Sequence, residues 1–129
     1  MIEFKNKIQN LSVFKGETAT IRTVAYTREA DYSSYPETLT DTVKNVTGFT
    51  PVFIVKRFKE DTDANKIFQA TGTLTTPASG IIDFTITKTQ NNISAGQYFY
   101  EIIITDTTTR YVLNSGEYNV FESVKDSLT

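Results

Sequence analysis

The residues of this chain that could do chemistry are carboxylates gathered in one polar stretch, KEDTDANK, residues 59–66. Asp61, Asp63 and Asn65 have the alternate spacing of the first three ligands of a calcium loop, in which several oxygens must converge on one point. The rest of that pattern is missing, because Lys66 stands where the sharp turn needs glycine and no glutamate occupies the bidentate position. We therefore predict a solvated turn here and no metal site.

The same stretch supplies paired carboxylates for acid–base catalysis, such as Glu60 beside Asp61. No other reactive group is placed around them by the sequence, and the chain contains neither His nor Cys. Without these residue types there is no Ser-His or Cys-His arrangement, no disulfide and no thiolate or imidazole ligand for zinc. We therefore predict that the protein is not an enzyme and uses no cofactor.

A second group of candidate residues consists of Tyr26, Tyr32 and Tyr35 with Pro36, in or beside the polar segment 27–45. This segment has no apolar periodicity, and loops of such length in compact domains are often functional. Tyrosine also covers much contact area at small entropic cost. We predict a long loop over residues 27–45 with these four residues as a candidate interaction loop. A mobile excursion, or a strap over the edge of the domain, is an equally supported interpretation.

Length and charge narrow the classes of protein. With 129 residues the chain is expected to form one domain with a sizeable core. The formal charge of -2 and the pI of about 5.1 argue against a nucleic-acid binder, which needs a basic surface for phosphates. No run approaches the length of a membrane span, and the first ten residues lack the apolar core of a signal peptide. A soluble protein without a targeting signal is expected.

Short β-strands must position these residues. Thr, Ile, Val, Phe and Tyr are plentiful, and such residues favour a pleated, half-buried surface. Runs of alternating apolar and polar residues are separated by turn signals, as in an all-β domain. The clearest run places Ile82, Phe84 and Ile86 on one face, and a turn is expected at residues 114–116.

The stretch SAGQYFYEIIITD, residues 94–106, alternates its rings. Tyr98, Tyr100, Ile102 and Ile104 are two residues apart and share one face of a strand. In immunoglobulin-like sandwiches a tyrosine opens a late strand and its hydroxyl bonds back to the preceding corner. Tyr98 is the candidate for this corner, and Tyr100 stands where many such domains have cysteine. We predict that both rings lie between two sheets; an exposed stacking platform is the alternative.

Five segments carry a resemblance to a known family. They are KGET (15–18), NVTGFTPVFIVK (45–56), GTLTTPASGIIDFTIT (72–87), ISAGQYFYEIIITD (93–106) and GEYNV (116–120). In these patterns of turn and core residues, over about residues 8–121, the chain resembles the immunoglobulin-like modules of tailed-phage virion proteins. The N-terminal domain of baseplate upper proteins is one such module. Segment 27–45 is longer than the family pattern.

The resemblance implies one domain over residues 1–129: an immunoglobulin-like β-sandwich of about seven to nine antiparallel strands, with a loop inserted at 27–45 and a tail at 122–129. It implies a structural component of a virion, assembled in the host cytoplasm, that docks onto other virion proteins or copies of itself without catalytic residues. A receptor-binding or fibre region usually follows such a module in tail proteins. The first expectation is therefore a decoration protein on the capsid or a small adaptor that seats a fibre.

Two alternatives remain open at this point: a tail or baseplate component, and an adhesin module that binds carbohydrate or a cell surface. Neither the resemblance nor the composition leads us to expect a nucleic acid, a membrane or a small-molecule ligand as partner.

Overall fold

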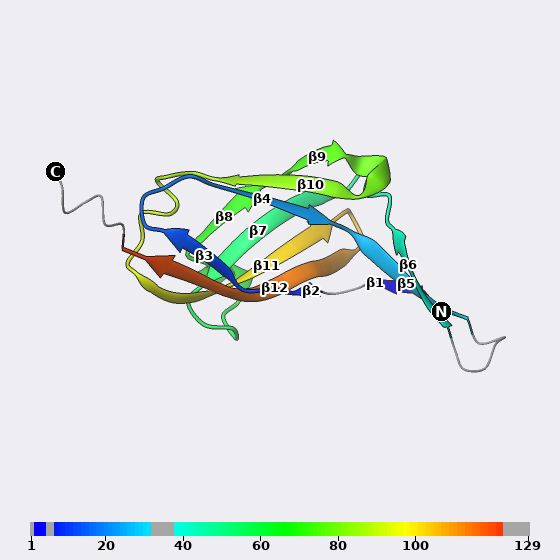
Figure 1. Ribbon diagram of the computed structural model, residues 1–129, viewed down its shortest axis with the longest axis horizontal. Helices are drawn as coiled ribbons and strands as arrows, with labels where there is room; N and C mark the ends of the chain where they lie inside the picture. The colour runs from blue at the N-terminus through cyan, green and yellow to red at the C-terminus, as the bar shows by residue number, and fades with distance from the viewer. Residues whose placement is uncertain (1, 5–6, 32–37, 123–129) are drawn as a thin grey trace.

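A computed structural model describes residues 2–4, 7–31 and 38–122. These residues form twelve β-strands, which are arranged in three sheets, and two short 3-10 helices (Figure 1). The prediction of an all-β protein is confirmed, with more strands than expected. None of the described residues belongs to a helix of the length and apolarity that crossing a membrane requires.

The largest sheet has the order β2-β12-β11-β7-β8, and β3 also pairs with β12. Its strands are β2 (Lys7–Ile8), β3 (Leu11–Phe14), β7 (Thr50–Lys56), β8 (Phe68–Thr71), β11 (Gly96–Thr105) and β12 (Arg110–Phe121). Both β2 and β3 run parallel to β12, so the prediction of antiparallel strands throughout is wrong at this edge. Strands so distant in sequence are joined by no hairpin, and the connection therefore does not force them to be antiparallel.

The second sheet has the order β4-β10-β9 and is antiparallel. Its strands are β4 (Ala19–Val24), β9 (Thr73–Thr76) and β10 (Ile81–Ile86). It lies face to face with the largest sheet, since the Phe84 ring on β10 is 5.8 Å from the Phe53 ring on β7. We call these two sheets the body.

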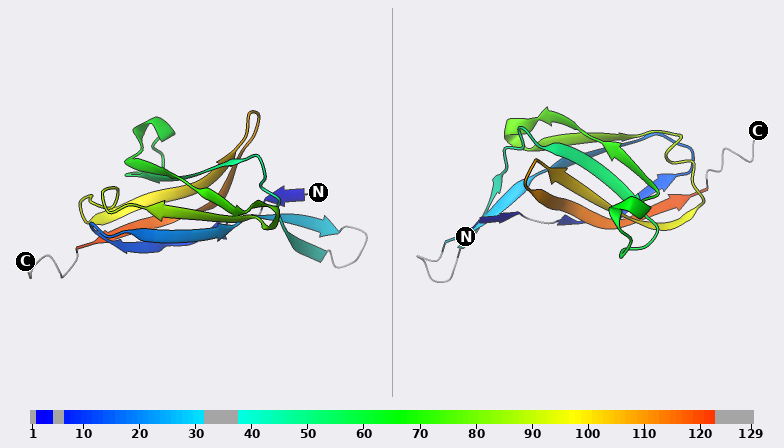
Figure 2. Two further views of the ribbon diagram at one scale, coloured as in Figure 1. Left: turned by 90° about the horizontal axis from the view of Figure 1, so that it is seen from above. Right: turned by 180° about the vertical axis from the view of Figure 1, so that it is seen from behind.

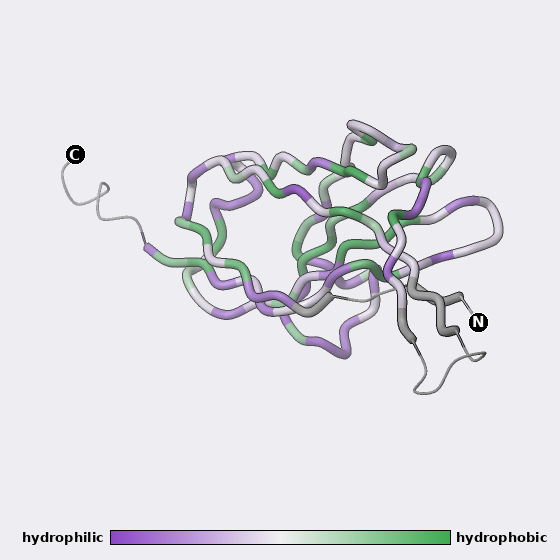
Figure 3. The backbone as a smooth tube through the Cα atoms, turned by 45° about the vertical axis from the view of Figure 1, so that its right-hand side comes forward, coloured by the Kyte–Doolittle hydropathy of each residue, from purple (hydrophilic) through white to green (hydrophobic). Residues whose placement is uncertain are grey.

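One core fills the space between the two sheets of the body. Apolar stretches of the chain gather where the strands cross the middle of the body (Figure 3). Phe53 is central, with its ring stacked on Tyr100 at 5.2 Å and edge-on to Tyr118 at 5.8 Å. Aromatic pairs of this kind contribute about 0.5–1.5 kcal/mol each beyond their buried area. These three rings belong to the largest sheet, and Phe84 from the second sheet packs against Phe53 to complete the aromatic cluster.

A third sheet, which we call the arm, projects from one end of the body (Figures 1 and 2). It has the order β1-β5-β6, with β1 (Ile2–Phe4), β5 (Tyr26–Asp31) and β6 (Thr38–Val43). The prediction of a loop over residues 27–45 is wrong, because most of this segment forms the β5–β6 hairpin. The arm extends beyond the core and needs no apolar face, so its strands lack the alternation by which strands are found in a sequence.

Ala25 and Gly80 join the arm to the body. The buried Ala25 separates β4 from β5; its N–H donates to the Gly80 carbonyl at 2.9 Å, and its carbonyl accepts from Lys44 N–H at 2.9 Å. Gly80 follows the 3-10 helix η2 (Pro77–Ser79) with φ of +70°. A Cβ atom on Gly80 would lie 2.7 Å from the Lys44 carbonyl oxygen. Glycine is thus required where both arm strands meet the body.

Candidate interaction surfaces

The predicted interaction loop is reduced to one described residue. Tyr26 opens β5 and is 37% exposed, whereas Tyr32, Tyr35 and Pro36 lie outside the described residues. Tyr26 faces Val43 across the hairpin, and Val43 is 43% exposed. The base of the arm therefore presents an apolar cross-strand pair to solvent.

All seven predicted core residues are buried in the body. They are Ile82, Phe84, Ile86, Tyr98, Tyr100, Ile102 and Ile104. The Tyr98 hydroxyl donates to the Ser94 carbonyl at 2.7 Å, which is the bond back to the preceding corner that the sequence predicts. The Tyr100 hydroxyl donates to the Gln9 carbonyl at 2.6 Å, and burial raises its pKa. The two rings thus fasten loops and the N-terminal segment to the core.

Gly116 makes the contact of Tyr100 with Gln9 possible. It stands directly opposite Tyr100 in the β11–β12 ladder, and a Cβ there would lie 2.2 Å from the Gln9 carbonyl oxygen. The predicted turn at residues 114–116 is wrong, because β12 continues through it as one strand. Gly116 provides room for the segment between β2 and β3 to approach the sheet.

A buried polar network around Asn91 was missed by the sequence analysis. The Tyr118 hydroxyl donates to Asn91 Oδ1, and Asn91 Nδ2 donates to the Glu17 carbonyl at 2.6 Å. Burial raises the pKa of Tyr118 well above its ordinary value. Asn91 and Tyr118 are both fully buried, so the network links the β10–β11 connection, β12 and the turn before β4. No spacing in the sequence distinguishes Asn91 from the neighbouring polar residues of that connection.

The polar stretch between β7 and β8 contributes an ion-pair cluster on the outer face of the largest sheet. Lys56, which is only 7% exposed, bonds Asp63 at 2.9 Å and Glu101 at 3.1 Å, and Arg110 is 3.6 Å from Asp63. Burial opposes the charge of Lys56, but hydrogen bonds and attraction from both carboxylates outweigh it and raise the pKa. The Lys56 hydrogen bond lowers the pKa of Asp63.

The carboxylates of this stretch do not converge on a common point. Asp63 belongs to the 3-10 helix η1 (Asp63–Asn65) and points to Lys56, whereas Asp61 accepts from the Phe58 N–H at 3.2 Å. Within the described residues, no group of three or more acidic side chains could hold a metal ion. The cluster instead ties the connection to β7 and β11.

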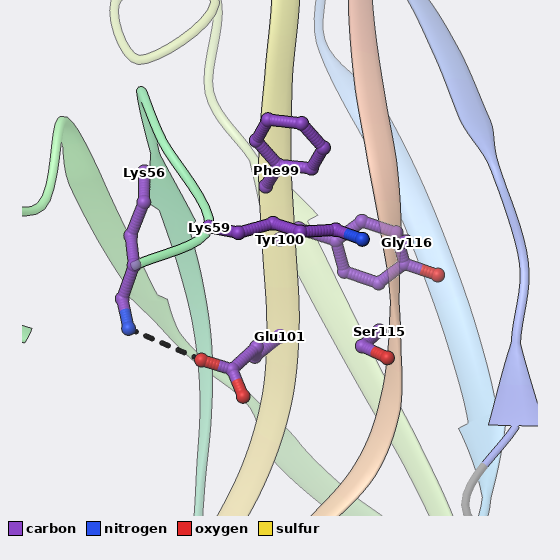
Figure 4. A pocket seen from close by; sticks show the side chains of 7 residues that line it. All are labelled: Lys56, Lys59, Phe99, Tyr100, Glu101, Ser115 and Gly116. Atoms are coloured by element: carbon purple, nitrogen blue, oxygen red, sulfur yellow. Dashed lines mark hydrogen bonds and ion pairs between the residues drawn. The ribbon is translucent and has the colours of Figure 1, made fainter. Parts of the chain in front are cut away.

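Next to this cluster lies a groove of about 270 Å³ on the outer face of β11 and β12 (Figure 4). The side chain of Lys59 extends across it, with its ammonium 5.6 Å from the Phe99 ring centroid. Glu101 and Ser115 line the other side. The groove combines the rings of Phe99 and Tyr100 with a few polar groups.

Among the described residues, large apolar side chains are exposed at three places on the surface. Phe14 and Phe121 are opposite each other in the parallel β3–β12 ladder and are half exposed. These two residues are the last of β3 and β12, and both strands end on the side of the body away from the arm (Figure 1). Phe58 and Ile67 are both exposed in the β7–β8 connection, and the Tyr26–Val43 pair is the third place. Apolar groups in such positions are candidates for contact with other proteins.

Comparisons with known proteins do not assign the chain to a family. No protein-family model matches it, and no curated protein is significantly similar in sequence.

Proposed function

We propose that this chain is a structural component of a bacteriophage virion that acts by docking onto neighbouring proteins. A decoration protein on the capsid surface is our first choice, together with a small adaptor that seats a fibre. A tail or baseplate component is the closest alternative. In each case the chain supplies a rigid immunoglobulin-like sandwich rather than a chemical activity.

The observation that carries the proposal is the strand order of the body. In immunoglobulin-like domains the second, fifth and fourth strands lie together in one sheet and the third, sixth and seventh in the other. With β3 as the first strand, and the arm and β8 as insertions, β4-β10-β9 has the former order and β7-β11-β12 has the latter. This strand order supports the resemblance, and in this assignment the arm is inserted between the second and third strands.

Two side-chain contacts support the same topology. Tyr98 forms the hydrogen bond of a tyrosine corner at the start of β11. Phe53 on β7 stacks on Tyr100, where immunoglobulin domains pack a tryptophan of the third strand against a disulfide. In a chain without cysteine, aromatic stacking takes the place of that covalent link.

Docking is supported by the placement of exposed apolar groups. The Phe14–Phe121 pair ends β3 and β12 at one end of the body, and the Tyr26–Val43 pair lies at the other end, where the arm begins. On a symmetric particle, many copies of one modest contact act together, so avidity replaces the need for a single strong interface. A rigid body with contacts at both ends suits such repetition.

The test is to find the chain in particles. Virions of the phage that encodes it would be banded by density, washed and analysed by mass spectrometry and immunogold labelling. We expect the chain in stoichiometric amounts with label on the capsid surface; label on the tail would favour the alternative location. Absence of the chain from washed particles, together with its presence in the infected-cell lysate, would contradict a structural role.

Glycan binding is a second candidate, favoured by the groove of Figure 4. Phe99 offers a ring for a sugar, and Lys59, Glu101 and Ser115 offer polar groups around it. A glycan array would be probed with the native chain, a Phe99→Ala variant and, as control, Phe58→Ala in the exposed connection. Binding lost in the first variant and kept in the control would support this function; no binding by the native chain would dismiss it.

A further inference from the structure

The arm has two edges, and they differ in length. On one side of β5 lies β1, which contributes three residues, and on the other lies β6 with six. Four of the six residues of β6 are β-branched, and it contains no proline, glycine or lysine. Protein edge strands are usually kept from pairing by prolines, lysines, bulges or short length. Apart from its single Asp41, β6 has none of these protections.

Other edges of the described residues are less suited to pairing. Strands β8 and β9 have four residues each, and the β9 ladder is irregular where it meets β10. The edge formed by β2 and β3 is interrupted at residues 9 and 10. β4 has six residues, but Arg22 and Asp83 form an ion pair at 2.7 Å, so its sheet carries no net charge.

The arm, in contrast, is acidic. Its strands contain Glu3, Glu29, Asp31 and Asp41 against Arg28. Four carboxylates and one guanidinium give a net charge of -3, so all remaining residues together carry +1 in a chain of net charge -2. The acidity of the chain is thus concentrated in its projecting sheet. Two arms placed edge to edge would repel each other, which argues against a second copy as the occupant.

We propose that the edge of β6 binds a basic, extended segment of a different protein by β-strand addition. Main-chain hydrogen bonds along β6 supply the affinity and the charge of the arm selects the partner. The exposed Tyr26–Val43 pair lies at the base of the same hairpin, where one end of the added strand can pack. This inference deepens the proposed docking role and rests on it for the identity of the partner as a virion protein.

The probe is a fluorescein-labelled peptide of about ten residues, enough to span β6, that alternates Lys or Arg with Val or Thr. We expect saturable binding by anisotropy, weakened by salt, with slower amide hydrogen exchange in residues 38–43 and no change in residues 68–76. A matched peptide with Glu for the basic residues should not bind. The same basic peptide with alternate backbone nitrogens methylated should bind at least tenfold more weakly, because it cannot complete a ladder.

Charge is tested in the protein by the double variant Glu29→Gln with Asp41→Asn, expected to bind about tenfold more weakly with a smaller salt dependence. The matched control neutralises two acids outside the arm, Glu60→Gln with Glu122→Gln, and should bind within twofold of the native chain. Circular dichroism checks that both variants fold.

Undiminished binding of the methylated peptide, protection outside residues 38–43, or equal losses in both variants would overturn strand addition. No binding of the basic peptide would also overturn it. A concentration-dependent dimer in light scattering, protected at residues 38–43, would identify a second copy as occupant and overturn the choice of partner. Detection in washed virions is independent of these results, so strand addition can fail while the virion proposal stands.

Discussion

Replacing Tyr118 with phenylalanine should destabilise the body, although it removes only one oxygen atom. The Tyr118 hydroxyl donates to Asn91 Oδ1, and both side chains are fully buried. Without the Tyr118 hydroxyl, Asn91 Oδ1 loses this hydrogen bond in a place that water cannot reach. The loss should lower the free energy of unfolding by about 1–3 kcal/mol. For 129 residues the entropy of unfolding is roughly 0.27 kcal/mol per kelvin, so Tm should fall by about 4–11 °C.

Differential scanning calorimetry measures this change, with Tyr98→Phe as matched control. The Tyr98 hydroxyl bonds the carbonyl of the exposed Ser94, which water can reach, so the control should lose only about 0.5–1.5 kcal/mol. In an Asn91→Ala background the acceptor is gone, and Tyr118→Phe should then be neutral or stabilising. A Tm unchanged within about 1 °C for Tyr118→Phe, or a larger loss in the control, would refute the reasoning.

Three further predictions concern the core, the N-terminal segment and pH. Phe84→Ala should cost about 3–5 kcal/mol in urea unfolding, and a loss below 1 kcal/mol would contradict a filled core. Gly116→Ala places a Cβ 2.2 Å from the Gln9 carbonyl oxygen, so hydrogen exchange at residues 7–10 should quicken, and unchanged exchange would contradict the contact. Because the pKa of Asp63 is lowered from 3.8, its contribution to stability is present above that pH and lost as pH falls through the lower folded-state pKa. Asp63→Asn should therefore cost more stability at pH 6 than near pH 2; an equal cost at both would contradict the ion pair.

Much of the body could be predicted because one face of each central strand is buried. Ile82, Phe84 and Ile86 alternate with polar residues since β10 is solvated on its other face, and this leaves a period of two in the sequence. The hydrogen bond of the Tyr98 hydroxyl could be predicted because its acceptor, the Ser94 carbonyl, is close to it in the sequence. Such features depend on neighbours in sequence, which a single chain displays.

The arm and the interaction surfaces could not be predicted, because they depend on partners distant in sequence. The pairing of β1 with β5 joins residues far apart, and neither strand needs an apolar face. Gly116 resembled a turn residue because its requirement for space comes from Gln9, which is distant in sequence and lies in the segment between β2 and β3. Likewise, the burial of Lys56 follows from the fold-back of η1, and a lysine at the end of an apolar strand otherwise indicates a solvated end.

The division into body and arm has a consequence for how a docking function could respond to mutation. The body is held by buried rings and by side-chain bonds across its sheets, such as that from Thr23 to Asn114. The arm is held by main-chain ladders and by the junction at Ala25 and Gly80. Segments with few buried apolar contacts open locally at lower free energy than a core. Added main-chain bonds along β6 would therefore stabilise the arm more than the body. Substitutions in the core should change how much folded protein exists, whereas substitutions in the arm should change what that protein binds.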